Sequence, residues 1–452
     1  RSQSWKNLFN QSTKFIQPKK NGAWDFPFEP REVNNNYTEA NGWQYTFFVP
    51  QDINGMIDFY GGKDRFEAKL DQLFNSTSEM TGREQVDVTG LIGQYAQGNE
   101  PSHHVAFLYN YIDKPEKTKE LIHKILNDFY KNSPDGLIGN EDCGQMSAWY
   151  VLASMGIYSV TPGSGIWTTV EPYFDEITVN LEDGTKRIIT KDNYKENQFL
   201  GFEFLKDREI KPISEEEKIV TVPVFKNSER AFKDKMTVVL TSQNPNDKIY
   251  YSINGKKEQT FKNPISIKET STIKAYVING EKKSKTISGT FTKKPNDYAI
   301  TLHSTYTPQY HAGGPDGLLD GIFGTENWKK GDWQGYFDQD FEAVIDLGKA
   351  KSISEVDAHF LQDSRSWIMM PTKMEIYTST NKEVFKLAGV IEKDANPFND
   401  SIFTDHWKVQ FQPQKIQYIK VKVYNYGAFP KGHLAEPFQG KSYIFVDEIT
   451  IK

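Results

Sequence analysis

Three short polar strings hold the residues of this chain that are best suited to chemistry. The first string is residues 38–45 (TEANGWQY), the second is residues 97–104 (QGNEPSHH) and the third is residues 139–145 (GNEDCGQ). Each places a carboxylate near Gly and Asn, beside a segment whose pattern predicts a helix. Acids so far apart along a chain can meet only if the helices between them pack side by side. Converging acids with amide neighbours suit general acid–base chemistry on a sugar, with a hard cation nearby.

The acid of the first string is Glu39, which precedes Trp43, Gln44 and Tyr45. A carboxylic acid against aromatic walls retains its proton more readily, because burial disfavours its charged form. Such an acid can protonate a leaving glycosidic oxygen. The same pattern describes an acid at the start of a helix in a polar loop, and one Glu alone does not decide between the two.

The second string has the features of a cation site. Its run 99–101 (Asn-Glu-Pro) offers an amide oxygen and a carboxylate, and the proline restricts Glu100 to an extended conformation. Oxygen ligands, with the backbone of Gln97 among them, suit calcium, whereas His103 and His104 would suit zinc. No HExxH or CxxC spacing supports zinc, so calcium is favoured. The alternatives are helix capping by Glu100, and packing or substrate hydrogen bonding by the two histidines.

In the third string, Asp142 precedes a predicted helix and would face exposed amide N–H groups. A helix N-terminus lowers the pKa of a carboxyl group and leaves it ionised, ready to take a proton from water. An ordinary N-cap has the same geometry. Cys143 has no histidine close in sequence, so we expect a small buried residue rather than a nucleophile.

The elements that must position these strings are helices, up to about Ile157. Asp113, with Glu116 three residues later, is typical of a capping box. Gly156 is placed to end the last helix. We expect helices across residues 66–74, across 105–109, after Asp113 and across 146–153.

From Tyr158 onward the pattern changes to short alternating runs that predict strands, including an Asn254-Gly255 hairpin turn. A chain of 452 residues is too long for one core, so several domains are expected. The predicted architecture is multidomain α plus β. The predicted boundaries are 1–157 for the helical region, 158–219 for a β segment that closes it, 220–294 for a small β-sandwich module and 298–452 for a last β domain.

Composition limits the possible partners and compartments. The hydrophobic share is 37%, aromatic residues reach 14% and the net charge is −6. No basic stripe is present, so nucleic acid is not an expected partner. No apolar run approaches the roughly 20 residues that cross a bilayer. A single cysteine excludes an internal disulfide. The start has neither an initiator Met nor a signal-like segment, so we expect a piece of something longer with its targeting information missing.

As an ordered set, the three strings resemble glycoside hydrolase family 92, in which the third string continues through Met146-Ser147-Ala148-Trp149. Members of this family are exo-acting, calcium-dependent α-mannosidases. The resemblance runs from Arg1 to about residue 215. It implies an (α/α) toroid for the helical region and inversion at the anomeric carbon. It also implies mannose-containing glycans as substrates, with an α-1,2 or related linkage.

Carried over position by position, the resemblance makes Glu39 the general acid and Asp142 the general base. Asn140 stands where some members carry a second acid. The calcium-binding string matches Gln97, through its backbone, together with Asn99 and Glu100. The remaining candidates for substrate contact are Trp43, Gln44, His103, His104 and Glu141.

The last block, residues 298–452, resembles discoidin-type modules (coagulation factor C-domains), including sugar-binding modules of family 32. The matching runs are 316–321, 343–348 and 446–449. The resemblance implies a β jelly roll with a possible second glycan contact. It also implies a structural calcium ion, for which the candidate ligands are Asp316, Asp320 and Glu448.

Three aromatic residues of this block, Trp328, Trp333 and Tyr336, are candidates for stacking on a sugar ring, although we expect at least two of them to pack in the core. The preceding module, about 220–291, is similar to small β domains appended to chitobiase-type enzymes, and a spacer role is expected.

The sequence therefore favours an exo-acting, inverting, calcium-assisted α-mannosidase in a bacterial periplasm, at a cell surface or secreted. The alternative is a glycan-binding or structural piece in which the discoidin-like block binds sugar and the helical region is inert.

Overall fold

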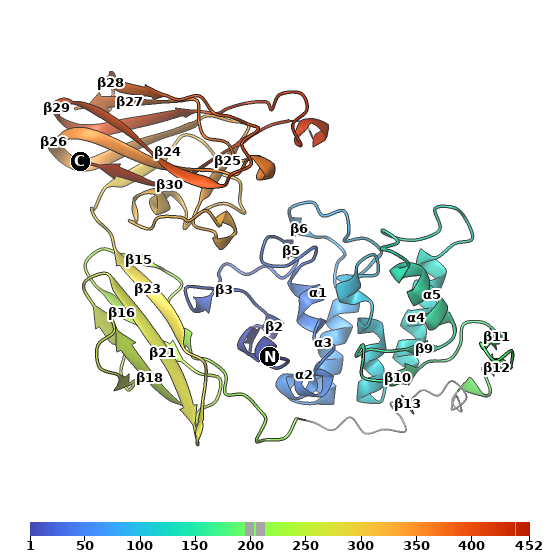
Figure 1. Cartoon of the computed structure of the whole chain (residues 1–452). Coiled ribbons are helices and arrows are strands. Elements are labelled where there is room, and N and C mark those ends of the chain that lie inside the picture. Colours follow the sequence, from blue (N-terminus) through green and yellow to red (C-terminus); the bar gives the residue numbers. More distant parts are fainter. Residues whose placement is uncertain (195–202, 205–212, 439) are drawn as a thin grey trace. The chain divides into compact units, whose positions relative to one another are not determined.

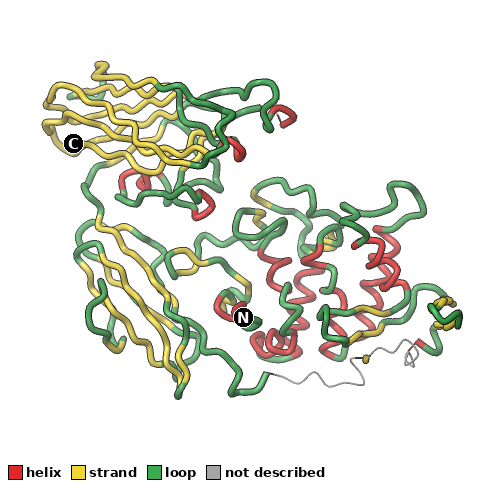
Figure 2. Tube along the Cα trace, viewed as in Figure 1, coloured by secondary structure: helices red, strands yellow, loops and turns green. Residues whose placement is uncertain are grey.

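The computed structural model describes residues 1–194, 203–204, 213–438 and 440–452, which form two compact units (Figures 1 and 2). Residues 195–202 and 205–212 of the predicted 158–219 segment lie outside the described residues. Unit 1 holds residues 1–19, 24–222 and 279–284, and unit 2 holds residues 20–23, 223–278 and 285–452. Among the described residues, no helix is long and apolar enough to cross a membrane.

The helices of unit 1 confirm most of the periodicity-based predictions. Helices at 66–74, after Asp113 and at 146–153 are present, and Gly156 follows the last of them with φ 74°. The segment after Pro101 forms tighter 3₁₀ turns instead of an α-helix. The helices are η1 (Ser4–Asn7), α1 (Gly42–Phe47), α2 (Ile53–Tyr60), α3 (Lys63–Asn75), η2 (Glu100–Ser102), η3 (Val105–Ile112), α4 (Pro115–Phe129) and α5 (Gln145–Ser154).

Helix α3 forms because its apolar residues share one face. Phe66, Leu70 and Leu73 are fully buried on that face. In α4 the buried face consists of Ile122, Ile125 and Leu126. Helix α2 lies next to α3, and α4 next to α5 (Figure 1).

The capping box predicted at Asp113 and Glu116 is wrong. Lys114 occupies the N-cap position of α4 and makes no side-chain cap. Asp113 has a left-handed backbone (φ 61°), and its carboxylate lies 2.5 Å from Nζ of Lys63. The turn out of η3 therefore ends on Asp113 itself, and its side chain bonds to α3 rather than to α4.

One hydrophobic core connects the helices of unit 1. It contains Trp5, Phe9, Phe47, Phe107 and Trp149 among many others. The toroid that the resemblance implies is not established by these elements and stays a prediction. The strands numbered before the end of this unit are β1 (Phe9–Asn10), β2 (Phe15–Ile16), β3 (Lys19–Lys20), β4 (Ala23–Trp24), β5 (Glu32–Val33), β6 (Thr81–Gly82), β7 (Leu91–Ile92), β8 (Tyr95–Ala96), β9 (Ile157–Tyr158), β10 (Ile166–Thr169), β11 (Glu176–Asn180), β12 (Lys186–Thr190) and β13 (Glu203–Phe204).

The residues after Pro223 form a small β module. Its main sheet has the order β15-β23-β21-β18-β19. The predicted Asn254-Gly255 turn is confirmed, since both residues have positive φ (49° and 70°) directly after β18. The strands are β14 (Val224–Phe225), β15 (Ala231–Phe232), β16 (Met236–Val238), β17 (Leu240–Thr241), β18 (Lys248–Ile253), β19 (Gln259–Thr260), β20 (Ile265–Ile267), β21 (Ser271–Asn279), β22 (Lys282–Lys283) and β23 (Ile287–Lys293).

The C-terminal residues form an antiparallel sheet with the order β25-β30-β26-β29-β27-β28, and β24 also pairs with β26. Long strands β26 and β29 curl over a core that includes Phe360, Trp407 and Ile419. The strands are β24 (Ala299–Leu302), β25 (Gln334–Phe337), β26 (Phe341–Gln362), β27 (Lys373–Ser379), β28 (Lys386–Glu392), β29 (Phe403–Tyr424) and β30 (Tyr443–Ile451). Short 3₁₀ helices are η6 (Pro315–Leu319), η7 (Trp328–Lys330), η8 (Ser364–Ser366) and η9 (Glu436–Phe438).

Two of the three aromatic candidates for sugar stacking are core residues. Trp333 is 1% exposed and Tyr336 is fully buried. Trp328 is partly buried, and its indole Nε1 donates to Asp363 at 3.0 Å. These positions confirm the expectation that at least two of the three pack in the core.

Candidate active site

Helix α1 fixes the first string. Asn41 caps the helix: its Oδ1 accepts from the backbone N–H of Trp43 at 3.0 Å, and its own N–H donates to Oε1 of Gln44 at 2.7 Å. This reciprocal cap sets the path of the chain just before the helix. Glu39 lies in that approach with an exposed side chain and a left-handed backbone (φ 52°).

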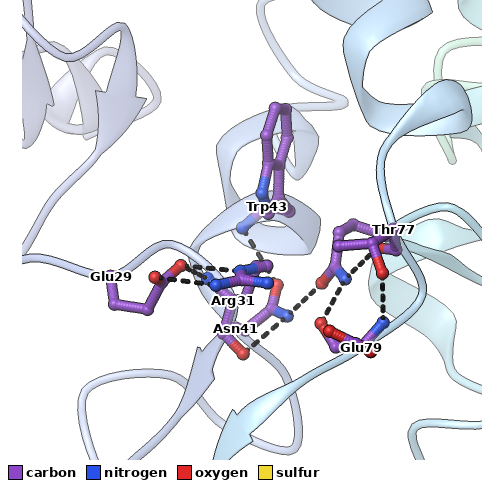
Figure 3. A network of polar contacts seen from close by, with 7 residues as sticks. Glu29, Arg31, Asn41, Trp43, Thr77 and Glu79 are labelled. Atoms are coloured by element: carbon purple, nitrogen blue, oxygen red, sulfur yellow. Dashed lines mark hydrogen bonds and ion pairs between the residues drawn. The ribbon is translucent and has the colours of Figure 1, made fainter.

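A buried amide network joins the first string to the residues before the second (Figure 3). Asn41 donates to the side-chain oxygen of Gln94 at 2.8 Å, and Gln44 donates to the Gln94 carbonyl at 2.7 Å. The Gln94 side chain donates in turn to the carbonyls of Thr77 and Glu79. Gln94 thus connects α1, the strand pair β7–β8 and the loop after α3.

The first and second strings meet directly. Nδ2 of Asn99 donates to the backbone carbonyl of Glu39 at 2.8 Å. Oδ1 of the same amide accepts from the N–H of Glu100 at 3.2 Å. Asn99 is buried, whereas the side chains of Glu39 and Glu100 are exposed. The candidate general acid and the candidate cation string are therefore neighbours, although 60 residues separate Glu39 from Asn99.

His103 joins the second string to the third. Its Nε2 lies 2.9 Å from the carbonyl of Gln97, and its Nδ1 lies 3.1 Å from Nε2 of Gln145. A carbonyl only accepts, so Nε2 carries the ring proton and Nδ1 accepts from the Gln145 amide. The indole of Trp149 on α5 also donates to the His103 carbonyl. Both contacts hold the start of α5 against the second string.

The electrostatics of His103 reflect the same convergence. Burial lowers the pKa of the imidazole, and the bond to Gln97 and the charges of Glu100 and Asp142 partly oppose that shift. The ring is therefore neutral at pH 7. Asp142 and Glu100 both act on the one imidazole, which indicates that the carboxylates of the second and third strings share a neighbourhood.

The third string makes an unusual turn into α5. Asp142, Cys143 and Gly144 are three consecutive residues with left-handed backbones, with φ values of 53°, 56° and 96°. Glu141 caps the helix: its two oxygens accept from the backbone N–H (3.2 Å) and hydroxyl (3.0 Å) of Ser147. Gly144 occupies the N-cap position of α5, and Glu141 rather than Asp142 bonds the first turn of the helix.

Asp142 and Cys143 of this turn and Glu39 have exposed side chains. Cys143 is exposed, so the prediction of a buried residue is wrong. The carboxylates of Asp142 and Glu39 are exposed, and within the described ranges neither has a hydrogen-bond partner. Both are therefore open to water and to a bound molecule.

The second string fits a hard cation by the chemistry of its donors. The Gln97 carbonyl, the Asn99 amide oxygen and the Glu100 carboxylate are all oxygens, as calcium prefers. The Gln97 side chain is held by the hydroxyls of Tyr95 and Tyr130, so its backbone is fixed. In the described part of the chain, no group of three His, Cys, Asp or Glu side chains is arranged for a metal. That observation is compatible with a site built from carbonyl and amide oxygens.

The other candidates for substrate contact lie deeper. His104 is buried, its Nε2 donates to the Phe47 carbonyl at 2.8 Å, and burial lowers its pKa to about 4. Gln44 belongs to the amide network, and the ring of Trp43 lies 4.7 Å from that of Phe15. These contacts account for all three residues as structural supports, and a contact with substrate stays a prediction.

The predicted second metal site is partly assembled in unit 2. Asp320 and Glu448 lie on either side of one loop: Oδ1 of Asp320 accepts from the N–H of Ile322 and Oε2 of Glu448 from that of Gly321. Burial raises the pKa of Asp320 to about 6 and that of Glu448 to about 9. Asp316 instead pairs with Lys294 at 3.2 Å.

Sequence reasoning missed Gln94 and Gln145, which hold the strings together. Gln145 is the last residue of the third string, but no sequence pattern indicates that a glutamine bonds to a residue distant in the chain. Gln94 lies just before the second string, and no local signal indicates that it bonds to α1.

Residues 1–221 match the family model described as the glycosyl hydrolase family 92 catalytic domain. This part of the chain is therefore similar to the catalytic domain of glycosyl hydrolase family 92. Residues 228–290 match the model of the chitobiase/β-hexosaminidase C-terminal domain.

Two individual proteins are similar to part of this chain. An uncharacterized secreted glycosidase of Arthroderma benhamiae is 27% identical over 229 residues, which are 44% of this chain and 27% of that protein. A family 92 α-mannosidase of Bacteroides thetaiotaomicron is 40% identical, over 42% of this chain and 24% of that chain, with a TM-score of 0.38. The chain thus spans about a quarter of the length of these two relatives.

The C-terminal block also has a similar solved structure. A family 32 carbohydrate-binding module of Clostridium perfringens, in complex with GalNAc-β-1,3-galactose, is 16% identical with a TM-score of 0.22. The match covers 34% of this chain and 94% of that one.

Proposed function

We propose that this chain takes part in hydrolysis of terminal α-mannosides with inversion, using Glu39 as general acid and Asp142 as general base. The observation that carries the proposal is the bonding path from Glu39 through Asn99 to the second string and on through Gln97, His103 and Gln145 to the third. This path links the backbone of Glu39 to the turn that carries Asp142, and both carboxylates are exposed.

In the proposed reaction Asp142 takes a proton from a water molecule as the water oxygen bonds to the anomeric carbon. The glycosidic C–O bond breaks, and Glu39 gives its proton to the leaving oxygen. Inversion requires the water to fit between the sugar and the base. We therefore expect the two carboxyl groups to lie roughly 6.5–9.5 Å apart in the substrate complex.

The role of the protein around these acids is positional. Asn99 holds the backbone of Glu39, and His103, as a neutral ring, holds the Gln97 carbonyl and the Gln145 side chain at once. Glu141 fixes the start of α5 beside Asp142. Residues held by such bonds lose little freedom on binding substrate, which favours catalysis by orientation.

Calcium is the proposed cofactor. Gln97, Asn99 and Glu100 would hold it, and the bound ion would contact sugar hydroxyls and stabilise a distorted ring. The support is the all-oxygen donor set and the fixed backbone of Gln97. Asp320 and Glu448 are proposed to hold a second, structural calcium ion in unit 2.

Several finer points belong to the same proposal. The helices of unit 1 would form part of an (α/α)6 toroid, and the predicted boundaries at 157, 219, 294 and 298 would separate the domains. The substrate would be a mannose-containing glycan with an α-1,2 or related linkage, met outside the cytoplasm. The secreted relative supports that location.

The experiment is hydrolysis of an aryl α-mannoside by the full chain. The proposal predicts hydrolysis that a calcium chelator reduces and added calcium restores. Asp142→Asn should lower kcat by roughly 10²–10⁴-fold. Asp183→Asn is a matched control, because Asp183 is an exposed acid in the β11–β12 turn that bonds only its neighbour Thr185 among the described residues. Activity that survives both chelation and Asp142→Asn would refute the assigned roles.

The rival function, glycan binding by residues 298–452 without catalysis, makes a different prediction. A chain that does not hydrolyse mannosides but binds mannan or galactosides in a titration would support it.

A further inference from the structure

A segment outside the three strings contacts two of them. Residues 87–90 (Asp-Val-Thr-Gly), called here the bridging segment, precede strand β7. The N–H of Gln97 donates to the Gly90 carbonyl at 3.0 Å, and the N–H of Gly98 donates to the Thr89 carbonyl at 3.1 Å. These bonds extend the β7–β8 hairpin into the second string, so the bridging segment pairs directly with residues of the proposed cation site.

The other side of the bridging segment meets the third string. Oδ1 of Asp87 accepts from Nδ2 of Asn140 at 2.9 Å. Gly90 lies against Ile138: a Cβ built on it would be 2.9 Å from that side chain and 3.3 Å from Cβ of Gln97. Asn140 is two residues before Asp142, so the contact is close to the proposed base.

Glycines make the close approach possible. A Cβ on Gly139 would lie 2.8 Å from the Gly98 carbonyl and 3.2 Å from Oγ1 of Thr89, and a Cβ on Gly98 would collide with the same hydroxyl. Gly139 also has φ 78°, which other residues rarely adopt. Thr89 thus fills the space between the second and third strings, and its buried hydroxyl has no partner among the described residues.

We propose that the bridging segment is a positioning element that sets the place of Asp142 relative to the proposed cation string. Asp87 does so by accepting a hydrogen bond from Asn140, and Thr89 by filling the space between the second and third strings. This inference rests on the proposed function. Asp87 acts through Asn140 and touches no reacting atom, so it is a positioning residue rather than a catalytic one. The bond between Asp87 and Asn140 is exposed to water, and its geometric role follows from the place of Asn140 two residues before the base.

The primary test compares Asp87→Ala with Asp87→Asn in the full chain. Alanine removes the acceptor, whereas the asparagine oxygen can still accept from Asn140. Asp87 also accepts from Nε2 of Gln85, which lies outside the strings. We expect Asp87→Ala to lower kcat by roughly three- to tenfold, the effect of losing the bond to Asn140, with little change in KM. Asp87→Asn should recover most of the rate, with the same pH profile as the native protein.

A double-mutant cycle isolates the bond. If Asp87 acts through Asn140, Asp87→Ala adds nothing to the loss caused by Asn140→Ala. Additive losses would overturn the proposal, as would equal losses in the alanine and asparagine variants at position 87. Asp183→Ala is the matched control for removal of an exposed acid that accepts local bonds.

A second readout is independent of activity. The amides of Gln145 and Met146 donate to the Asp142 and Glu141 carbonyls in the native turn. In Asp87→Ala and Thr89→Ala these amides should exchange hydrogen faster, while Thr89→Ser, which keeps the oxygen between the glycines, should resemble the native protein. Unchanged exchange in all variants would overturn the positioning role. Absence of mannosidase activity in the native chain would instead refute the proposed function, and the exchange result would still decide the inference.

Discussion

The two candidate catalytic acids share a backbone conformation that ordinary residues avoid. Glu39 has φ 52° and Asp142 has φ 53°, and Cys143 continues the left-handed turn. Such conformations cost of order 1–2 kcal/mol for each residue other than glycine, and they persist where surrounding structure enforces them. Here the Asn41 cap and the Glu141–Ser147 bonds supply that enforcement. The strained backbone at Glu39 and Asp142 lowers stability, which indicates that the positions of these two side chains matter more than the stability that is lost.

This strain predicts opposite effects of glycine on stability and activity. Asp142→Gly should raise the free energy of unfolding by up to about 1 kcal/mol, since glycine adopts positive φ freely, and should abolish hydrolysis. Thermal unfolding and an aryl mannoside assay measure both. Lys382→Gly is the control, because Lys382 is exposed and also has positive φ (67°) but lies outside the strings. A loss of stability in Asp142→Gly would contradict the argument.

The leaving group distinguishes the two acids. Glu39→Gln should still hydrolyse a dinitrophenyl mannoside, whose leaving group needs no proton, but should lose roughly 10²–10⁴-fold on an alkyl mannoside. Asp142→Asn should lose activity on both substrates, because each needs an activated water. Equal losses on the two substrates in Glu39→Gln would remove its role as acid.

His104 predicts a pH dependence of stability. Its folded pKa is about 4, below the ordinary 6.5, because burial disfavours the charged ring. The unfolded chain therefore binds the extra proton between pH 6.5 and 4, and the free energy of unfolding falls by roughly 3 kcal/mol as the pH drops through that window. His104→Gln, which can still donate to the Phe47 carbonyl, should flatten this part of the curve in urea unfolding. An unchanged curve would show that His104 is accessible to protons in the fold.

At the scale of elements, the helices could be predicted from the spacing of apolar residues and from the family resemblance. Apolar spacing located α3, α4 and α5, because each buries one face. The contacts at their ends were harder to foresee. Asp113 ends η3 and Asp142 precedes α5, each in a left-handed turn, and Glu141 bonds the first turn of α5. Left-handed turns at residues other than glycine leave little local signal, so their side-chain directions could not be predicted.

In unit 2, strand β30 brings Glu448 to the loop that follows η6. Glu448 is buried and Asp320 is partly buried, and among the described residues no cation lies beside the Glu448 carboxylate. A buried carboxylate without a cation is costly. Without calcium, Glu448→Gln should therefore be more stable than the native chain. Calcium should raise the melting temperature of the native chain and leave that of Glu448→Gln unchanged; an equal response in both would exclude Glu448 as a ligand.

At the scale of the whole molecule, the chain combines a region similar to the family 92 catalytic domain with a module similar to the chitobiase C-terminal domain and a C-terminal β domain. The strings could be predicted to converge because their motifs occur together in one family. The connections that bring them together could not, since Gln94, Gln145 and Asp87 act through contacts between residues distant in sequence. The connections between the three strings are therefore tertiary hydrogen bonds, which are visible only in the folded structure.

The stereochemistry of hydrolysis tests the central claim most directly. Proton NMR can follow the first mannose released from an aryl α-mannoside by the full chain with calcium. If Glu39 and Asp142 act on opposite sides of one anomeric carbon, the first product is β-mannose, and the α anomer grows in later by mutarotation. Release of α-mannose first, or of no mannose at all, would contradict the account.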